Sequence, residues 1–379
     1  MAEWIFILSL ALPLWAFLGY PLMVAVLARL SKAPTTGQAR AYRVSIIIAA
    51  HNEARHIAQK LQSLLEQTYQ AESLEILLAS DGSTDNTLEE AASINDPRIQ
   101  RLDLPRQGKQ ATLNAAFAQS TGDILVFTDA DNRWLPETLE HLLAPLNDHD
   151  VGVVGGNMQI DKTGDHLSQG DSTYRRFESW LRNAESRCGC MVATDGALMA
   201  MRRELFTSVP GDCNDDFHLS TCAPAAGKRI AYAERAIVLD QGVDDTGKQF
   251  RRRIRVTLGG LHSLTRRASL LNPLRHGRYA LALLSHKLLR RLAPLFLLPL
   301  LLSTAALAST SAWMNTLLWL QLAGYGTGLV ALLLGLRWRL PKPLRLASFL
   351  LVSLAGMALA VCYYLTGQRL GAWNPQQNR

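Results

Sequence analysis

The sequence predicts an α/β domain with a mixed, largely parallel sheet, flanked by apolar helices that cross a membrane. Short apolar runs alternate with amphipathic stretches from Val44 to Thr128, a pattern typical of parallel strands joined by crossover helices. Uncharged stretches long enough to span a bilayer precede and follow this region. Three expected strands end in polar clusters, "HNE", "SDGSTD" and "DAD". Since ligands collect beyond the carboxyl ends of such strands, the candidate site is expected there.

The first, second and fourth expected strands are short runs rich in Val, Ile and Leu that stop at polar residues, and the third, "RIQRLDL", is more polar. A helix is expected after the first strand, through about Tyr69, and another in "GKQATLNAAFAQS". Between them a helix should follow "DGSTDNT", with Ser83 or Thr84 as its N-cap. The strands are expected at residues 44–50, 74–80, 98–104 and 123–128.

Four transmembrane helices are expected, one N-terminal and three C-terminal. The first 28 residues contain one charged residue, Glu3, and lack both a basic n-region and a clear A-x-A cleavage site, which favours a transmembrane helix over a signal peptide. No charged residue occurs from Ala293 to Gly335, and 311–315 divide that stretch into two spans. A further span at 346–366 follows a basic loop.

The placement of Lys and Arg predicts the orientation. Basic residues cluster after the first span, at 29–43, and between the last two spans, at 337–345. Under the positive-inside rule both segments are cytoplasmic, so the polar middle domain is expected in the cytosol. The five cysteines lack zinc-site spacing and fit a reducing compartment.

A basic segment links the middle domain to the C-terminal spans. Between Gln249 and Arg291 there are eleven Lys or Arg residues and no acid. Because they alternate with apolar residues and lead into a span, a membrane interface is favoured over nucleic acid, and His286 and Lys287 are expected to contact headgroups. The expected domains are residues 1–30 (transmembrane helix), 40–245 (α/β domain), 246–290 (basic amphipathic interfacial segment), 291–366 (three transmembrane helices) and 367–379 (tail).

Two carboxylates, Asp129 and Asp131, end the fourth expected strand. On an ideal strand both would point to one face; where the chain turns, one can face the sugar of a nucleotide while the other reaches a divalent cation. Mg²⁺ and Mn²⁺ take few carboxylates together with substrate phosphate oxygens. The alternative is a simple turn. Neither a G-x-G-x-x-G motif after the first strand nor a phosphate loop is present.

The order of the motifs gives a resemblance. "AAHNEA", "SDGSTDNT", "GKQATLN" and "DILVFTDAD" occur in sequence, and together they resemble glycosyltransferase family 2, which has the nucleotide-sugar-binding GT-A fold. The resemblance continues through "NDDFHLST" and "QFRRRIR", covers about residues 44–265, and is greatest to the membrane-embedded hyaluronan, cellulose and poly-N-acetylglucosamine synthases. It implies a multi-pass protein of the bacterial inner membrane, with a cytosolic catalytic domain that uses Mg²⁺ or Mn²⁺ and a UDP-sugar.

The resemblance also implies roles for individual residues at the donor. All of them lie at or near the carboxyl ends of expected strands, or at the start of the helix that follows. They are Asn52 and Glu53 at the ribose or base, Asp81 as an acceptor from the base, Lys109 at the diphosphate, Asp129 at the ribose and phosphate, and Asp131, with Asp129, at the metal.

At the acceptor, the resemblance implies that an acid of "NDDF" is the general base, which takes the proton of the acceptor hydroxyl. That role falls to Asp216, and the sequence alone leaves Asp215 open. The same residues suit a helix N-terminus capped by Asn214. Asp195 and Gly196 in "VATDGALMA" are expected near the acceptor sugar, where a glycine permits close backbone approach.

"QFRRR" resembles the Q-x-x-R-W motif of the synthases, with Gln249 and Arg252 in place for the diphosphate and acceptor. Arg253 stands where relatives have the Trp that lines the acceptor site, which is a departure from the family's pattern at that site. Arg252 is expected to contact the diphosphate, since Arg binds phosphate in bidentate fashion. The alternative for Arg252 is an interfacial role like that of its neighbours.

The expected function is inverting transfer of a sugar from a nucleotide-diphosphate sugar to a growing envelope or extracellular polysaccharide. With four spans, a polymer channel would need an export partner or a homo-oligomer. The alternative is single addition to a lipid-linked acceptor. A catalytically silent nucleotide-sugar-binding subunit is a third possibility, which the presence of Asp131 and Asp216 disfavours. A transporter would want charges within its spans, and the charge-free spans argue against one.

Overall fold

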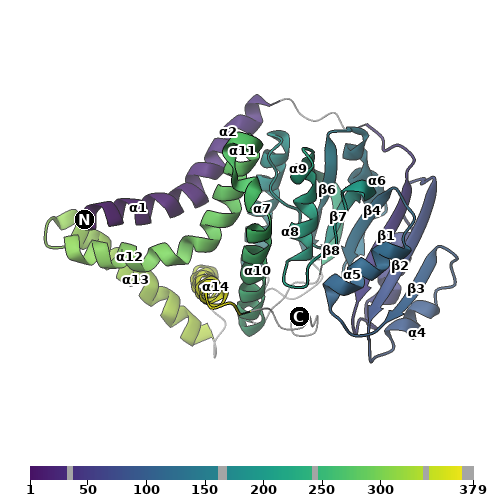
Figure 1. Cartoon of the computed structure of the whole chain (residues 1–379). Helices are drawn as coiled ribbons and strands as arrows, with labels where there is room; N and C mark the ends of the chain where they lie inside the picture. Colours follow the sequence, from purple (N-terminus) through teal and green to yellow (C-terminus); the bar gives the residue numbers. More distant parts are fainter. Residues whose placement is uncertain (32–36, 161–168, 241–245, 336–340, 369–379) are drawn as a thin grey trace.

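The computed structural model describes residues 1–31, 37–160, 169–240, 246–335 and 341–368. Figure 1 shows a sheet-containing domain at one side and long apolar helices at the other, with α7, α8 and α10 between them. The expectations for Lys32, for the basic loop after residue 335 and for most of the tail lie outside the described residues.

One eight-stranded sheet forms the core of the domain, in the order β3-β2-β1-β4-β7-β6-β8-β5. The first four of these strands are mutually parallel, β7 is antiparallel to both of its neighbours, and β8 is parallel to β6 and antiparallel to β5. The predicted mixed, largely parallel sheet is therefore confirmed. The strands are β1 Arg43–Ala50, β2 Ser73–Asp81, β3 Ile99–Leu104, β4 Ile124–Asp129, β5 Arg133–Trp134, β6 Val151–Ile160, β7 Leu198–Arg202 and β8 Arg229–Asp240.

The helices after β1, β2 and β3 occur where they were predicted, but they are shorter. The first ends at Leu65, and the second begins only at Thr87, with Asn86 rather than Ser83 or Thr84 at its N-cap. The helical segments of the domain are α3 Ile57–Leu65, α4 Thr87–Ala92, α5 Lys109–Gln119, α6 Thr138–Leu143, η2 Ala144–Asn147, α7 Gln169–Arg187, η4 Arg203–Leu205, α8 Asp215–Ser220 and α9 Cys222–Ala225.

The apolar helices and the segments that join them to the domain form the rest of the structure. They are α1 Ala2–Leu14, η1 Trp15–Gly19, α2 Tyr20–Leu30, α10 Thr246–Arg266, η5 Ala268–Leu271, α11 Pro273–Ala282, η6 Leu283–Leu289, α12 Arg290–Leu307, α13 Ala312–Gly335 and α14 Lys342–Leu365. Two of these segments, η1 and η6, are π-helical.

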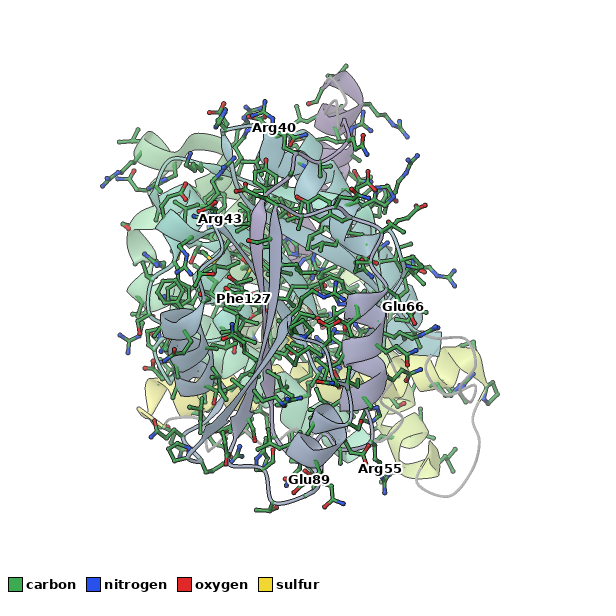
Figure 2. The ribbon with its side chains drawn as sticks, turned by 90° about the vertical axis from the view of Figure 1, so that its right-hand side faces the viewer. Arg40, Arg43, Arg55, Glu66, Glu89 and Phe127 are labelled. Atoms are coloured by element: carbon green, nitrogen blue, oxygen red, sulfur yellow. The ribbon has the colours of Figure 1, made fainter. Side chains whose placement is uncertain are left out.

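Alternate residues of the strands point into two cores. Ile46, Ile48 and neighbouring residues pack with α3 and α6 on one face of the sheet. Ile47 and Phe127 pack on the other face with α5 and α7, and that core continues into α2 and η6. Figure 2 shows Phe127 near the centre of the domain, whereas Arg55 and Glu89 lie at its rim. The domain and the first apolar helices thus share one core.

Four helices of the described part are long and apolar enough to cross a membrane: Ala2–Leu30, Pro273–Leu307, Ala312–Leu334 and Pro343–Leu365. The predicted number and order are confirmed. The second begins well before the expected position, because α11, η6 and α12 follow one another directly, with a kink inside α11 at Gly277, whose φ is 51°. The later part of the expected interfacial segment therefore belongs to a segment that is long and apolar enough to cross a membrane. The expectation that His286 contacts headgroups is wrong, because its ring is 2% exposed.

Candidate active site

The carboxyl end of β4 carries the carboxylates that the sequence singled out. Asp129 is its last residue, and Lys109, the first residue of α5, donates to Asp129 Oδ1 at 2.8 Å. The same Nζ lies 2.9 Å from Asp215 Oδ2 at the start of α8. Lys109 therefore joins two acids that are 86 positions apart in the chain (215 − 129).

The environment of this group shifts the pKa of each of the three side chains. Burial alone would lower the pKa of Lys109, but the charges of Asp129 and Asp215 raise it, so the amine stays protonated. Burial raises the pKa of Asp129 against the pull of Lys109. Asp215 has the opposite outcome, because Lys109 outweighs burial and its pKa is lowered.

Asp215 and Asp216 are adjacent, yet the structure gives them different environments. Burial and then the charge of Asp215 raise the pKa of Asp216 to about 6. Its Oδ1 accepts the N–H of Phe217 at 2.7 Å, and the described residues supply no ion pair for it. A partly buried acid with a pKa near the working pH is suited to accept a proton. The raised pKa and the lack of an ion pair in the described residues favour Asp216 over Asp215 as the base, and that role stays a prediction.

The start of α8 is fixed by α10. Asn214 occupies the predicted N-cap position, but its side chain does not cap the helix. Its Nδ2 instead donates to Val256 O at 3.0 Å, and its N–H donates to Ser263 Oγ at 3.2 Å. These bonds hold the acids of α8 against α10.

Gly196 lies at the centre of these groups. A Cβ placed on Gly196 would lie 3.8 Å from Asp216 Cβ, 3.9 Å from Lys109 Nζ and 4.0 Å from Asp129 Oδ2. The neighbouring Asp195 pairs with Arg182 of α7. The structure thus brings Gly196 together with the predicted base and the predicted donor residues.

A Gly196→Ala substitution should lower turnover about tenfold or more, because misplacing a substrate by about 1 Å can cost 100-fold. The methyl group would meet its protein neighbours at ordinary contact distances, so thermal stability should not change. Gly211→Ala is the matched control, since nothing lies within 4 Å of a Cβ there. Unchanged turnover in Gly196→Ala would show that the space beside Gly196 is not used by substrate.

Hydrogen bonds join the segment that follows β1 to the segment that follows β2. Asn52, whose φ is 56°, accepts the N–H of Thr84 on Oδ1 at 2.8 Å and donates its own N–H to Ser83 Oγ at 3.1 Å. Glu53 is buried, and its N–H donates to Thr87 Oγ1 at 2.8 Å. Asn52 and Glu53 thus lie at the predicted edge of the sheet, and their contact with nucleotide stays a prediction.

Asp81 holds the turn that begins α5. Its buried Oδ1 accepts the N–H groups of Gln107 at 2.7 Å and Gly108 at 3.0 Å, and Arg106 donates to its Oδ2. Gly108 has a φ of 96°, which favours glycine. This turn places Lys109, the first residue of α5, beside Asp129 and Asp215. A nucleobase at Asp81, as predicted, would share the carboxylate with the turn.

A buried network under the Asp129–Asp131 turn was not predicted. Lys60 is 1% exposed, and its Nζ donates to Thr128 Oγ1 at 2.7 Å and Asn132 Oδ1 at 2.6 Å. Thr128 Oγ1 and Asn132 Nδ2 both donate to Ala197 O, at 2.8 and 3.1 Å. Burial lowers the pKa of Lys60 to about 7, against the charges of Asp129 and Asp131. The network ties the acidic turn to the segment that carries Gly196.

A third acid accompanies Asp129 and Asp131. Asp240, the last residue of β8, has a pKa raised to about 7 by burial and then by the charge of Asp131; Arg175 and Arg252 oppose the shift. A divalent cation would relieve this crowding of carboxylates, and carboxylate oxygens are ligands that Mg²⁺ and Mn²⁺ accept. In the described ranges no three His, Cys, Asp or Glu side chains form a metal site by themselves. Substrate phosphate oxygens would have to complete the ligand set.

Two arginines of helix α10 lie near acids of the site, and a third packs against α14. The charge of Arg252 opposes the rise in the pKa of Asp240, and the charge of Arg255 contributes to the lowered pKa of Asp215. Arg255 Nε is buried with no hydrogen-bond partner in the described structure. Arg253 is not brought to this group: its guanidinium lies over the ring of Phe349 in α14, 5.5 Å from the centroid. The Gln249 side chain lies outside the described residues.

Comparisons with known proteins identify the family of the domain. A model of the family "Glycosyl transferase family 2" matches residues 45–208. An N-acetylglucosaminyltransferase of Rhizobium leguminosarum bv. viciae is 28% identical over 236 residues, 56% of this chain and 54% of that protein. An undecaprenyl-phosphate 4-deoxy-4-formamido-L-arabinose transferase of Proteus mirabilis is 32% identical over 147 residues, 38% of this chain and 42% of that protein.

A solved structure matches nearly the whole chain. The mannosyltransferase PcManGT from Pyrobaculum calidifontis, in complex with GDP-Man and Mn²⁺, has a TM-score of 0.73 and 26% sequence identity. The match covers 97% of this chain and 100% of that one. The chain spans about half the length of the curated relatives that it matches. The family match and the sheet agree, and residues 45–208 belong to a glycosyl transferase family 2 domain with the GT-A fold.

Proposed function

We propose that the chain is a membrane glycosyltransferase that moves a hexosyl or N-acetylhexosaminyl group from a nucleotide-diphosphate sugar to an acceptor hydroxyl, with inversion. The observation that carries the proposal is the meeting of Lys109, Asp129, Asp215, Asp216 and Gly196, which come from four separate segments of the chain. PcManGT, a similar structure, is solved with GDP-Man and Mn²⁺, which supports a nucleotide-sugar donor and a divalent cation here.

Asp216 would take the proton of the acceptor hydroxyl, whose oxygen then attacks the anomeric carbon as the bond to the diphosphate breaks. Lys109, with Arg252 and Arg255 of α10, would stabilise the negative charge on the departing diphosphate. Asp131 and Asp129, with Asp240 beside them, would hold Mg²⁺ or Mn²⁺, which supplies further positive charge there. Gly196 would leave room for the sugar.

The proposed location is the bacterial inner membrane, with the domain in the cytosol. The four long apolar helices support association with a membrane, and the flanking basic segments support the orientation. The similar N-acetylglucosaminyltransferase supports an amino-sugar donor, and the similar undecaprenyl-phosphate transferase supports a lipid-linked acceptor.

The test uses the full chain in nanodiscs with Mn²⁺, a lipid extract as the source of acceptor, and a panel of UDP- and GDP-sugars. Release of nucleoside diphosphate from one donor, dependent on the extract, is the expected result. Removal of Mn²⁺ with a chelator should abolish it, because hard cations supply several kcal/mol to such reactions, about 100-fold or more in rate. Binding of a donor with no release from any member of the panel would favour the silent subunit instead.

A further inference from the structure

Lys60 of α3 is a charged side chain inside the α/β domain, and it is 1% exposed. Its amine donates to Thr128 Oγ1 at 2.7 Å and to Asn132 Oδ1 at 2.6 Å, and it lies 5.1 Å from the centroid of the Trp134 ring. An ammonium group is costly to bury, and an apolar side chain of similar size would fill the same space without that cost. The lysine is therefore better explained by what its charge does than by packing.

The two acceptors of Lys60 flank the acidic turn, which carries the proposed metal ligands. Thr128 precedes Asp129 at the end of β4, and Asn132 follows Asp131. One amine is therefore bonded to both ends of this turn. Because Lys60 lies within α3, the same bonds attach the turn at two points to the helix that packs behind it.

The charge of Lys60 sets the direction of the hydrogen bonds around it. An ammonium group can only donate, so Thr128 Oγ1 and Asn132 Oδ1 are both acceptors. The Thr128 hydroxyl and Asn132 Nδ2 are then available as donors, and the shortest bond of each goes to Ala197 O, at 2.8 and 3.1 Å. Trp134 Nε1 also donates to Thr128 Oγ1, at 3.2 Å. This oxygen thus accepts two bonds and donates one, which is its full capacity.

Ala197 extends the network to the centre of the site. It follows Gly196, which lies beside the proposed base and Asp129. The pairing of β4 with β7 ends at Thr128. Beyond that point the two bonds to Ala197 O continue the connection between these segments. The distance between the acidic turn and the Gly196 segment therefore depends on side chains that Lys60 orients.

Resting on the proposed function, we propose that Lys60 is a positioning residue for the glycosyl transfer, which sets the distance between the acidic turn and the segment that carries Gly196. Lys60 itself is too buried to touch substrate. In the proposed reaction the cation and the diphosphate lie against the turn, and the sugar lies beside Gly196. The distance between the two segments then determines how the anomeric carbon is aligned between the acceptor hydroxyl and the departing diphosphate.

A positioning role and a purely electrostatic role predict opposite effects on the binding of the cation. The charge of Lys60 acts on Asp129 and Asp131, so its removal would by itself strengthen the binding of Mn²⁺. Loss of the bonds at Thr128 and Asn132 would instead loosen the turn, and loss of a partner behind the metal ligands costs about 10- to 100-fold in metal affinity. The sign of the change in Mn²⁺ affinity therefore separates the two roles.

The test compares Lys60→Met with wild type, as the full chain in nanodiscs. The variant should bind Mn²⁺ about tenfold or more weakly, measured by electron paramagnetic resonance in the presence of UDP and, in parallel, of GDP. Its turnover should fall about 100-fold, because a misplacement of about 1 Å can cost that much. Lys228→Met is the matched control and should change neither quantity, because Lys228 donates to His149 O at the opposite end of β8 from Asp240.

Two substitutions at Thr128 test the network without removing the charge of Lys60. Thr128→Ser keeps the hydroxyl and should retain most of the Mn²⁺ affinity and turnover. Thr128→Val keeps the shape but not the hydroxyl, and should reproduce the losses of Lys60→Met. Because both residues act through one network, the double variant should lose about as much as either single variant. The Thr128 pair also decides the question if Lys60→Met does not fold.

Three results would overturn the proposal. The first is tighter binding of Mn²⁺ by Lys60→Met than by wild type, which would assign the lysine a purely electrostatic role. The second is an equal loss in Thr128→Ser and Thr128→Val, which would show that the hydroxyl is not needed. The third is a double variant whose losses are the product of the two single losses. Failure of the proposed function would appear in wild type itself, as absence of donor turnover, whereas failure of this proposal appears only in the variants.

Discussion

Replacing Asp216 with asparagine should lower turnover by about 10²- to 10⁴-fold, the usual contribution of a general base. Asparagine keeps the shape of the side chain but cannot take the proton of the acceptor hydroxyl. Donor affinity should change little, because Lys109 pairs with Asp129 and Asp215 and not with Asp216. The measurement is nucleoside diphosphate release at saturating donor, together with a donor binding isotherm.

Asp215→Asn is the matched comparison for Asp216→Asn. It removes one partner of Lys109, so it should weaken donor binding as well as turnover. If Asp215→Asn lost all turnover at unchanged donor affinity while Asp216→Asn remained active, the assignment of the base would be reversed.

The same assignment predicts the acid side of the pH profile. The pKa of Asp216 is raised to about 6, and the base acts only when deprotonated. Turnover should therefore fall as pH drops below 6, to about one tenth of its plateau at one pH unit below the pKa. This limb should disappear from the residual activity of Asp216→Asn. A limb that persists in the variant would belong to another group.

Asp131→Asn should lower turnover about 100-fold or more at a fixed Mn²⁺ concentration, because the cation stabilises the departing diphosphate by several kcal/mol. Asparagine offers a neutral oxygen in place of a carboxylate, so the Mn²⁺ concentration for half-maximal activity should rise. Asp240→Asn should give a smaller rise, since its charge acts on the same group from the end of β8.

Direct Mn²⁺ binding in the presence of nucleoside diphosphate, followed by electron paramagnetic resonance, separates this effect from a loss of fold. Glu89→Gln is the control, because Glu89 lies at the rim of the domain (Figure 2). Equal Mn²⁺ affinity in Asp131→Asn and wild type would refute the assignment of Asp131 to the metal.

The first half of the sheet could be predicted closely from the sequence. β1, β2 and β4 are apolar runs that end at turn residues, as is typical of strands buried on both faces. These strands and the more exposed edge strand β3 lie within about two residues of their expected positions. The residues at their carboxyl ends followed from topology, because parallel strands end at the same edge of a sheet.

What the sequence left open depends on contacts between distant segments. The sequence did not indicate Asp240 as a site residue, because Asp240 comes near Asp131 only through the pairing of β8 with β6 and β5. Lys60 looked like any polar residue of an amphipathic helix, and only the packing of α3 under the β4 turn buries it. Asp215 and Asp216 became distinguishable because Lys109, which comes from α5, pairs with one of them.

Helix α14 lies beside α10, and Figure 1 shows it nearly end-on there. Thr265 Oγ1 and Tyr364 OH are 2.5 Å apart, Arg253 lies over Phe349, and a Cβ on Gly356 would lie 3.1 Å from Arg253 Cβ. The helix that carries Arg252 and Arg255 therefore packs on the last described span. Because a chain is synthesised from its N-terminus, the arginine helix leaves the ribosome long before its partner does. We therefore expect the positions of Arg252 and Arg255 to depend on α14, the last of the described helices to be synthesised.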